Sequence, residues 1–200
     1  MGTHLDSNLK WDIHLNFVYK ALNKAYYAIR QLKDTLDING LVSMYYGLVY
    51  PSMSYNIVVW GQAAGIDRLF IAQKRLIRLI FNLSLLTSCR NYFINNRLLT
   101  LPCIYLYSLL KHIKKDLNKF ELTGDQHRYP TRFGHLHRSS QHSTALFEKS
   151  PNYAALKLYD ELPKAIRDIT NLTKFKVVLR QFLIDKCFYS ISEYDEFAMQ

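Results

Sequence analysis

The side chains with the most evident chemistry are cations gathered in the middle of the chain. The segment 66–119 holds ten Lys and Arg residues against two Asp and no Glu, so it carries +8 of the chain's formal net charge of +10. These cations are Arg68, Lys74, Arg75, Arg78, Arg90, Arg97, Lys111, Lys114, Lys115 and Lys119. A concentrated basic segment is typical of a surface that contacts phosphate, either in nucleic acid or in an anionic membrane.

Two parts of this segment also show the period of an amphipathic helix. From about Ile66 to Phe81, apolar residues share one helical face and cations lie on the other. From about Ile104 to Phe120 the same pattern returns with lysines. The apolar positions are Leu69, Ala72, Leu76, Leu79 and Ile80 in the first helix and Leu106, Leu110, Ile113 and Leu117 in the second.

The two basic faces predict contact with the phosphates of a nucleic-acid duplex, without recognition of bases. The expected contact residues are Arg68, Lys74, Arg75, Arg78, Lys111, Lys114, Lys115 and Lys119, and Gln73 is expected to add a sugar contact. The alternative is that these cations only solvate the outer face of a helical bundle. A solvated face usually mixes signs through Glu and Lys pairs four residues apart, so the absence of Glu favours phosphate contact.

Four histidines form a second group of candidate ligands in the irregular segment 121–150, which has the composition of a linker. They are His127, His135, His137 and His142. The segment contains no Cys, and the histidine spacing matches no standard zinc pattern, so we expect no metal and no other cofactor. A hydrolase built on them is the weakest function, because it needs a bound metal and a carboxylate base. Arg128, Arg132 and Arg138 could extend the basic surface.

The elements that position these residues are all predicted to be helices. Apolar residues recur at steps of three and four from Trp11 to Leu36, which predicts a long amphipathic first helix. Asp37 and Gly40 are expected to mark the end of that helix. The fold class is therefore all-α, a helical bundle followed by an irregular linker and a small helical segment.

A second apolar helix is expected from about Leu41, and Pro51 is expected to kink or divide it before Trp60. Tyr45 and Tyr46 could stack on bases, but aromatic residues at helical spacing are more often part of a core. The bundle core is therefore the expected place for this pair.

The C-terminal segment reads as two helices and a tail. Tyr153 to Leu162 predicts a short helix stopped by Pro163, and Thr173 is the expected N-cap of the last helix. The acidic tail is expected to fray at Glu193, Asp195 and Glu196. Between residues 150 and 200, seven basic and seven acidic side chains cancel, which favours a structural or partner-binding role.

Three regions follow from these patterns: a bundle over 1–120, a linker over 121–150 and a small helical segment over 151–200. Three widely spaced cysteines, Cys89, Cys103 and Cys187, support no disulfide framework, so a reducing compartment is expected. No apolar run approaches the roughly 18 residues that cross a bilayer, and no signal-peptide core opens the chain. We therefore expect an intracellular protein, in the nucleus or cytoplasm, that is not secreted and has no membrane partner.

Several short motifs also follow one another in a specific order. They are Gly2-Thr3-His4-Leu5-Asp6 with Leu9, Trp11 and His14; Tyr46 to Pro51 with Tyr55 and Trp60-Gly61; Gln73-Lys74-Arg75 with Ile77-Arg78; His127, Tyr129 and Thr131-Arg132; and Ser150-Pro151 with Leu162-Pro163, Ile166 and Phe175-Lys176. In this order and spacing, over most of the chain, they resemble the C-terminal region of the reverse transcriptases of jockey-like non-LTR retrotransposons. The Tyr-Leu that usually precedes the first motif is replaced by Met1.

The resemblance implies a helical thumb that packs against the duplex of template and primer. Polymerase chemistry needs paired carboxylates that hold two metal ions, Mg in the parent enzyme, and the family places them in its palm. No adjacent aspartates occur here, so the expectation is a non-catalytic fragment of an RNA-directed DNA polymerase, with fingers and palm upstream of Met1. A function of another class also remains open, a helical protein-interaction module whose basic face meets an acidic protein.

Overall fold

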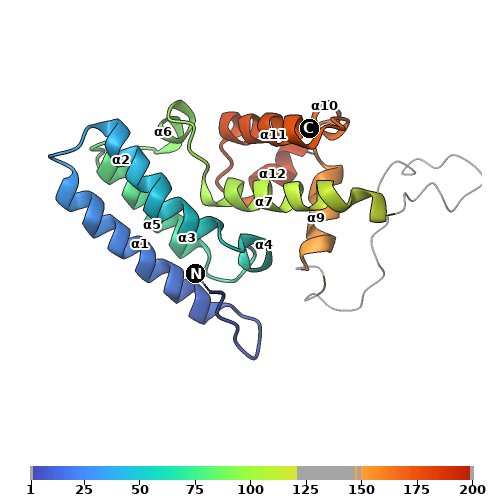
Figure 1. Cartoon of the computed structure of the whole chain (residues 1–200), viewed down its shortest axis with the longest axis horizontal. Coiled ribbons are helices and arrows are strands. Elements are labelled where there is room, and N and C mark those ends of the chain that lie inside the picture. Colours follow the sequence, from blue (N-terminus) through green and yellow to red (C-terminus); the bar gives the residue numbers. More distant parts are fainter. Residues whose placement is uncertain (1, 121–146, 148–149, 199–200) are drawn as a thin grey trace, which may run out of the picture. The chain divides into compact units, whose positions relative to one another are not determined.

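The computed structural model describes residues 2–120, 147 and 150–198, and all secondary structure within them is helical, as predicted (Figure 1). Two compact units can be separated: unit 1 comprises Met1–Tyr105 and Ile184–Tyr189, and unit 2 comprises Leu106–Leu183 and Ser190–Gln200. The predicted boundaries at 120 and 150 do not coincide with this division, which falls inside two helices, α7 (Leu101–Asp116) and α11 (Leu172–Lys186). Among the described helices, none is long and apolar enough to cross a membrane.

Unit 1 is built on α1 (Asp12–Leu32) and α5 (Asp67–Ile80), which lie side by side (Figure 1). Most of the predicted apolar stripe of each helix is buried, but Leu32 at the end of α1 is 39% exposed and Leu79 of α5 is half-buried. On α1 the buried residues are His14, Leu15, Val18, Leu22, Ala25 and Ile29, and on α5 they are Leu69, Phe70, Ala72, Gln73, Leu76, Ile77 and Ile80.

The two helices run in the same direction with a fixed register. Tyr19 of α1 lies against Arg68 of α5, and seven residues later Tyr26 lies against Arg75. A further seven residues on, Lys33 Nζ donates to the Oδ1 of Asn82 over 2.8 Å. Seven residues make about two helical turns, so the first two contacts repeat on the same face of both helices, and the third lies just past their C-terminal ends.

The first helix ends earlier than predicted, at Leu32 rather than Leu36. Asp37 belongs to the next helix, α2 (Ile38–Met44), as its N-cap, because its Oδ1 accepts the backbone N–H of Gly40 over 2.9 Å. Gly40 therefore lies in the first turn of α2 and breaks no helix.

Pro51 does not end the second helix, but the regular α-helix is divided by a π-helical turn directly before the element that contains Pro51. α2 continues through a π-helical turn, η1 (Tyr45–Val49), into α3 (Tyr50–Ser54). Pro51 then lies in the first turn of α3, where a missing backbone N–H is tolerated. The helical run ends before Asn56, which has a left-handed backbone conformation with a φ of 52° and is the N-cap of α4 (Ile57–Trp60).

Aromatic residues fill the core of unit 1. Tyr45 is fully buried, as expected for a core aromatic, whereas Tyr46 is only half-buried and donates from its hydroxyl to the carbonyl of Arg97 over 3.2 Å. Trp60 is also fully buried, and its indole Nε1 donates to the carbonyl of Tyr55 over 3.0 Å. Gly61 packs directly against the ring of Tyr105, and a Cβ there would collide with that ring and with the backbone of α4. The residue after α4 must therefore be glycine for the chain to pass this point.

The segment Ile184–Tyr189 completes unit 1 together with α6 (Arg90–Asn95). The hydroxyl of Thr100 donates to the carbonyl of Phe188 over 2.6 Å, and both groups are buried. The ring of Tyr189 lies edge-on to that of Phe70, with centroids 5.0 Å apart. These contacts hold the end of α11 and the residues after it in the core of unit 1.

Unit 2 contains the second half of α7 and a 3₁₀ turn, η2 (Leu117–Lys119). Further along the chain, it contains α9 (Pro151–Asp160), α10 (Lys164–Arg167), most of α11, and α12 (Ile191–Ala198). α9 confirms the predicted short helix before Pro163. The N-terminal turn of α11 is capped by Asn171 rather than by Thr173, because the Oδ1 of Asn171 accepts the N–H of Lys174 over 2.9 Å.

The acidic tail is a helix rather than a frayed end. Ser190 caps α12 by accepting the N–H of Glu193 over 3.1 Å. Tyr194 is fully buried, and its hydroxyl donates to the carbonyl of Leu158 in α9 over 2.7 Å. Burial of one large aromatic side chain on a preceding helix outweighs the unfavourable charge of the tail.

The stability of unit 2 is expected to depend on pH through Glu161, which faces Asp195 of α12. Burial, together with the charge of Asp195, raises the pKa of Glu161 to about 7, from 4.5 for an ordinary glutamate. A carboxyl with a raised pKa in the folded state stabilises the fold at low pH, and that contribution is lost as the pH rises toward 7. The midpoint temperature of thermal unfolding should therefore decrease when the pH is raised from about 5 to about 8.

Glu161→Gln should remove most of this dependence, since an amide keeps the neutral form at every pH. Glu196→Gln, which changes an exposed carboxylate of the same helix pair, is the matched control. Thermal unfolding followed by circular dichroism at the two pH values checks the prediction. An unchanged pH dependence in Glu161→Gln would show that the Glu161 and Asp195 pair does not control the stability of unit 2.

Candidate nucleic-acid interface

The cations of α5 occupy the solvent-facing side of the helix, as predicted. Arg68 and Arg75 are exposed, and Lys74 and Arg78 are half-buried. Among the residues that the structure describes, none of the four forms an ion pair with a carboxylate. The four positions divide into two pairs, because Arg68 and Arg75 point toward α1 whereas Lys74 and Arg78 lie on the side of Tyr189 and Thr87.

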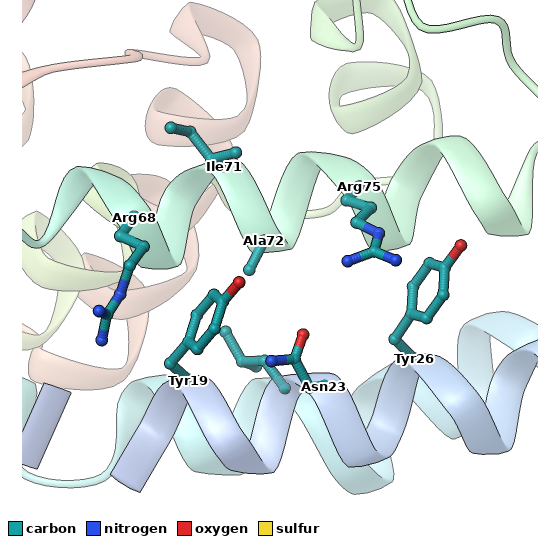
Figure 2. Close-up of a pocket in the computed structure, with 8 residues that line it drawn as sticks. Tyr19, Asn23, Tyr26, Arg68, Ile71, Ala72 and Arg75 are labelled. Carbon is teal, nitrogen blue, oxygen red and sulfur yellow. The ribbon is translucent and has the colours of Figure 1, made fainter. Parts of the chain in front are cut away.

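Arg68 and Arg75 each stack on a tyrosine of α1 (Figure 2). The guanidinium carbon of Arg68 lies 4.6 Å from the ring centre of Tyr19, and that of Arg75 lies 4.0 Å from the ring centre of Tyr26. The Nη2 of Arg68 also donates to the Oδ1 of Asn16 over 2.6 Å. Stacking on an aromatic face holds each guanidinium in place and leaves its planar edge available for further hydrogen bonds.

The two arginine and tyrosine pairs border a shallow depression between α1 and α5, here called the α1–α5 groove. It is lined by Tyr19, Leu22, Asn23, Tyr26, Arg68, Ile71, Ala72 and Arg75. Figure 2 shows Asn23 between the two pairs, with Ile71 pointing away from α1. The cavity measures about 120 Å³, well below the roughly 300 Å³ of a small-molecule pocket, so an anionic group fits it better than a whole metabolite.

Lys74 and Arg78 are held more tightly within unit 1. The ammonium of Lys74 lies 4.6 Å from the ring centre of Phe70 and 5.6 Å from that of Tyr189. Arg78 donates from Nη2 to the carbonyl of Thr87 over 3.3 Å, and its buried Nε has no hydrogen-bond partner among the described residues. These two cations contribute charge to the surface but have less freedom to reach a ligand than Arg68 and Arg75.

Gln73 is a correction to the predicted site. Its side chain is fully buried, with the amide nitrogen donating to the hydroxyl of Tyr45 over 2.7 Å and to the carbonyl of Leu99 over 2.9 Å. Its Oε1 accepts the backbone N–H of Leu101 over 2.8 Å. Both N–H donors of this amide and one lone pair of its oxygen are thus used inside the core, and the side chain is fully buried, so Gln73 makes no sugar contact in this fold.

The lysines of α7 belong to unit 2, and two of the four are engaged within it. Lys114 donates to the hydroxyl of Tyr159 over 2.8 Å and to the carbonyl of Arg167 over 2.9 Å. Burial lowers the pKa of Lys114, and the nearby Asp168 raises it in part. Lys119 pairs with Asp116 at 2.6 Å, and the hydrogen bond from Lys119 lowers the pKa of that aspartate. Lys114 therefore has a structural role in unit 2, and its phosphate contact stays a prediction.

Lys111 and Lys115 remain as candidate contacts on α7. Lys115 is exposed and forms no hydrogen bond or ion pair with a described residue. Lys111 is half-buried beside the ring of Tyr107, and burial, followed by the charges of Lys176 and Lys115, lowers its pKa. The α5 and α7 cations belong to different units, and joint contact with one backbone stays a prediction.

Three polar residues of the groove were absent from the predicted site, namely Tyr19, Asn23 and Tyr26 of α1. They recur at steps of four and three beside the buried stripe of the same helix. That spacing was visible in the sequence, but only the register of α1 against α5 pairs the tyrosines with the arginines. The four histidines of the segment 121–150, at which no metal was expected, and its three arginines, which could extend the basic surface, lie outside the described residues.

Other site chemistry can be assessed only for the described part of the chain. There, no three His, Cys, Asp or Glu side chains lie close enough together to hold a metal ion. Cys89, Cys103 and Cys187 are buried thiols, and burial raises the pKa of Cys103 to about 12.

The groove and the basic face of α5 are thus the best-formed candidate site of the described residues. Comparison with known proteins adds no assignment to it. No family model matches the chain, and neither a curated protein nor a solved structure gives a match.

Proposed function

We propose that this chain binds the phosphate backbone of a nucleic-acid duplex through α5, as a non-catalytic, thumb-like part of a retrotransposon-encoded RNA-directed DNA polymerase. The observation that carries the proposal is the pair of exposed arginines, Arg68 and Arg75, each fixed on a tyrosine of α1 and neither paired with a carboxylate among the described residues. The order of sequence motifs supports the assignment to a polymerase thumb.

The geometry of the arginine pair suits a repeating anionic backbone. Arg68 and Arg75 are seven residues apart on one helix, which separates them by about 10 Å along its axis. Tyr19 and Tyr26 hold the guanidinium groups, so less side-chain entropy is lost when phosphate binds. A guanidinium donates to two phosphate oxygens at once, which a lysine ammonium cannot do in the same plane.

Contacts of this kind position a protein on a duplex without reading its sequence. Lys74 and Arg78 add positive charge on the other side of α5, and Lys111 and Lys115 present charge on unit 2. Non-specific binding to an RNA–DNA hybrid, with strong dependence on salt, is the expected behaviour.

Fluorescence anisotropy of a labelled RNA–DNA hybrid across a salt series tests the proposal. The logarithm of the association constant should fall linearly with the logarithm of salt concentration, by about 0.9 for each phosphate neutralised on a B-form duplex. Binding that is absent at low salt, or that ignores salt, would rule out phosphate contact as the function of this face.

A second candidate is a helical protein-interaction module. Large apolar side chains such as Tyr27 and Ile71 are each 61% exposed on unit 1, which is compatible with a protein partner. Light scattering after size exclusion separates the two functions. Self-association in a protein without affinity for nucleic acid would favour the interaction module over the duplex-binding thumb.

A further inference from the structure

The loop between α5 and α6 exposes two leucines at the tip of a tight turn. The turn runs from Ser84 to Thr87, with the N–H of Thr87 donating to the carbonyl of Ser84 over 3.2 Å. The hydroxyls of the same two residues are hydrogen-bonded at 2.8 Å. Leu85 and Leu86 occupy the central positions and are 85% and 98% exposed.

This turn is anchored to the helices beneath it. Arg78 donates from Nη2 to the carbonyl of Thr87, and the N–H of Leu83 donates to the carbonyl of Arg78 over 2.9 Å. Asn82, with a φ of 53°, accepts a hydrogen bond from Lys33 of α1. The leucines are therefore presented on a supported turn fixed to both α1 and α5.

The central positions of a turn usually hold Gly, Pro, Asn, Asp or Ser, because these residues favour the backbone conformation and are well hydrated. Leu85 and Leu86 offer neither advantage, and each keeps most of its apolar surface in water. Packing within unit 1 does not explain them, so a partner that covers the tip of the turn is the physical alternative.

The charge around the turn selects an anionic partner. Arg78 is hydrogen-bonded to the carbonyl of Thr87 in the turn, and Arg90 follows the turn in sequence as the first residue of α6. The sequence contains no carboxylate between Asp67 and Asp116. An exposed apolar pair in a basic segment is the arrangement by which proteins insert Leu, Ile or Phe between base steps while other basic residues hold the phosphates.

We infer that the turn carrying Leu85 and Leu86 is a wedge that inserts between stacked base pairs of the bound duplex, an inference that rests on the proposed function. An anionic membrane has the same charge and also accepts apolar side chains. Even a single myristoyl chain, however, is only a marginal membrane anchor, and two leucines bury less apolar surface than that chain. A wedge, by contrast, needs only one or two apolar side chains.

The test uses short RNA–DNA hybrids that carry 2-aminopurine at successive positions of the DNA strand. Saturating wild-type protein should raise the emission about twofold or more at some positions, because inserting a side chain unstacks the neighbouring base. Leu85→Ser with Leu86→Ser should abolish that rise while keeping the salt dependence of binding. Val177→Ser, an apolar-to-polar change at a residue that is 65% exposed in unit 2, should leave both signals unchanged.

The outcomes separate this inference from the function on which it rests. If wild-type protein fails to bind the hybrid, the proposed function fails and the wedge with it. If it binds with the expected salt dependence but leaves 2-aminopurine emission unchanged, only the wedge is overturned. Leucine-dependent sedimentation with phosphatidylserine vesicles, without any change in 2-aminopurine, would overturn the wedge in favour of a membrane contact.

Discussion

Gln73→Ala should lower the free energy of unfolding by about 3–5 kcal/mol, the largest effect that we expect from a single polar substitution. The change removes the side chain that pairs with the carbonyl of Leu99 and the N–H of Leu101, and both groups are left in the interior. Each unsatisfied buried group costs about 1–3 kcal/mol, and the cavity left by the truncated side chain adds to this.

Urea denaturation followed by tryptophan fluorescence measures this effect in the right place, because Trp11 and Trp60 both lie in unit 1. Gln31→Ala, at an exposed position of α1, provides the matched control and should change stability by less than about 0.5 kcal/mol. A loss below about 1 kcal/mol in Gln73→Ala would show that the amide does not hold α5 to the start of α7.

Arg68→Ala with Arg75→Ala should weaken duplex binding about 10- to 100-fold at low salt, while leaving the fold intact. The expected loss corresponds to about 1.4–2.8 kcal/mol, in the range of two charge-assisted contacts on an exposed surface. Both side chains are exposed, and the main packing contact of each is its stacking on a tyrosine ring of α1. Anisotropy at one fixed, low salt concentration measures the difference.

Lys164→Ala with Lys174→Ala removes the same charge from exposed positions of unit 2, where acidic and basic residues balance. If both double variants lose affinity equally, total charge rather than the α1–α5 groove determines binding. If Arg68→Lys with Arg75→Lys restores affinity only in part, the planar guanidinium contributes beyond its charge.

The helical period of the sequence was sufficient to predict the helices that carry the candidate site. The buried stripes of α1 and α5 follow the apolar positions three and four residues apart, because burial of one face is what stabilises an amphipathic helix. The cations of α5 were placed correctly on the solvent side for the same reason. Pattern arguments of this kind depend only on local spacing.

Features that depend on tertiary contacts were missed. The sequence suggested that Gln73 is an exposed polar neighbour of Lys74. In the structure its side-chain amide is hydrogen-bonded to the carbonyl of Leu99 and to the backbone N–H of Leu101. The acidic tail looked unfavourable for a helix, yet Tyr194 finds a buried site on α9. In both cases one long-range contact outweighs the local preference, and the spacing of residues in the sequence cannot predict such a contact.

The tyrosine partners of the arginines were missed for a related reason. Tyr19 and Tyr26 lie on a different helix from Arg68 and Arg75, and their pairing depends on the register of α1 against α5. The sequence shows the spacing of the tyrosines on α1 and of the arginines on α5, but it does not show how far one helix is shifted along the other. Pro51 shows what a local rule can predict, since a kink or division was expected near this proline and a π-helical turn separates α2 from α3 there.

The measurement that tests phosphate binding by α5 most directly is the salt dependence of binding to a B-form DNA duplex, compared between wild-type protein and Arg68→Ala with Arg75→Ala. If each arginine neutralises one phosphate, the slope of log affinity against log salt should be shallower in the variant by about 1.8. Equal slopes for the two proteins would contradict the proposal, because they would show that neither arginine contacts a phosphate in the complex.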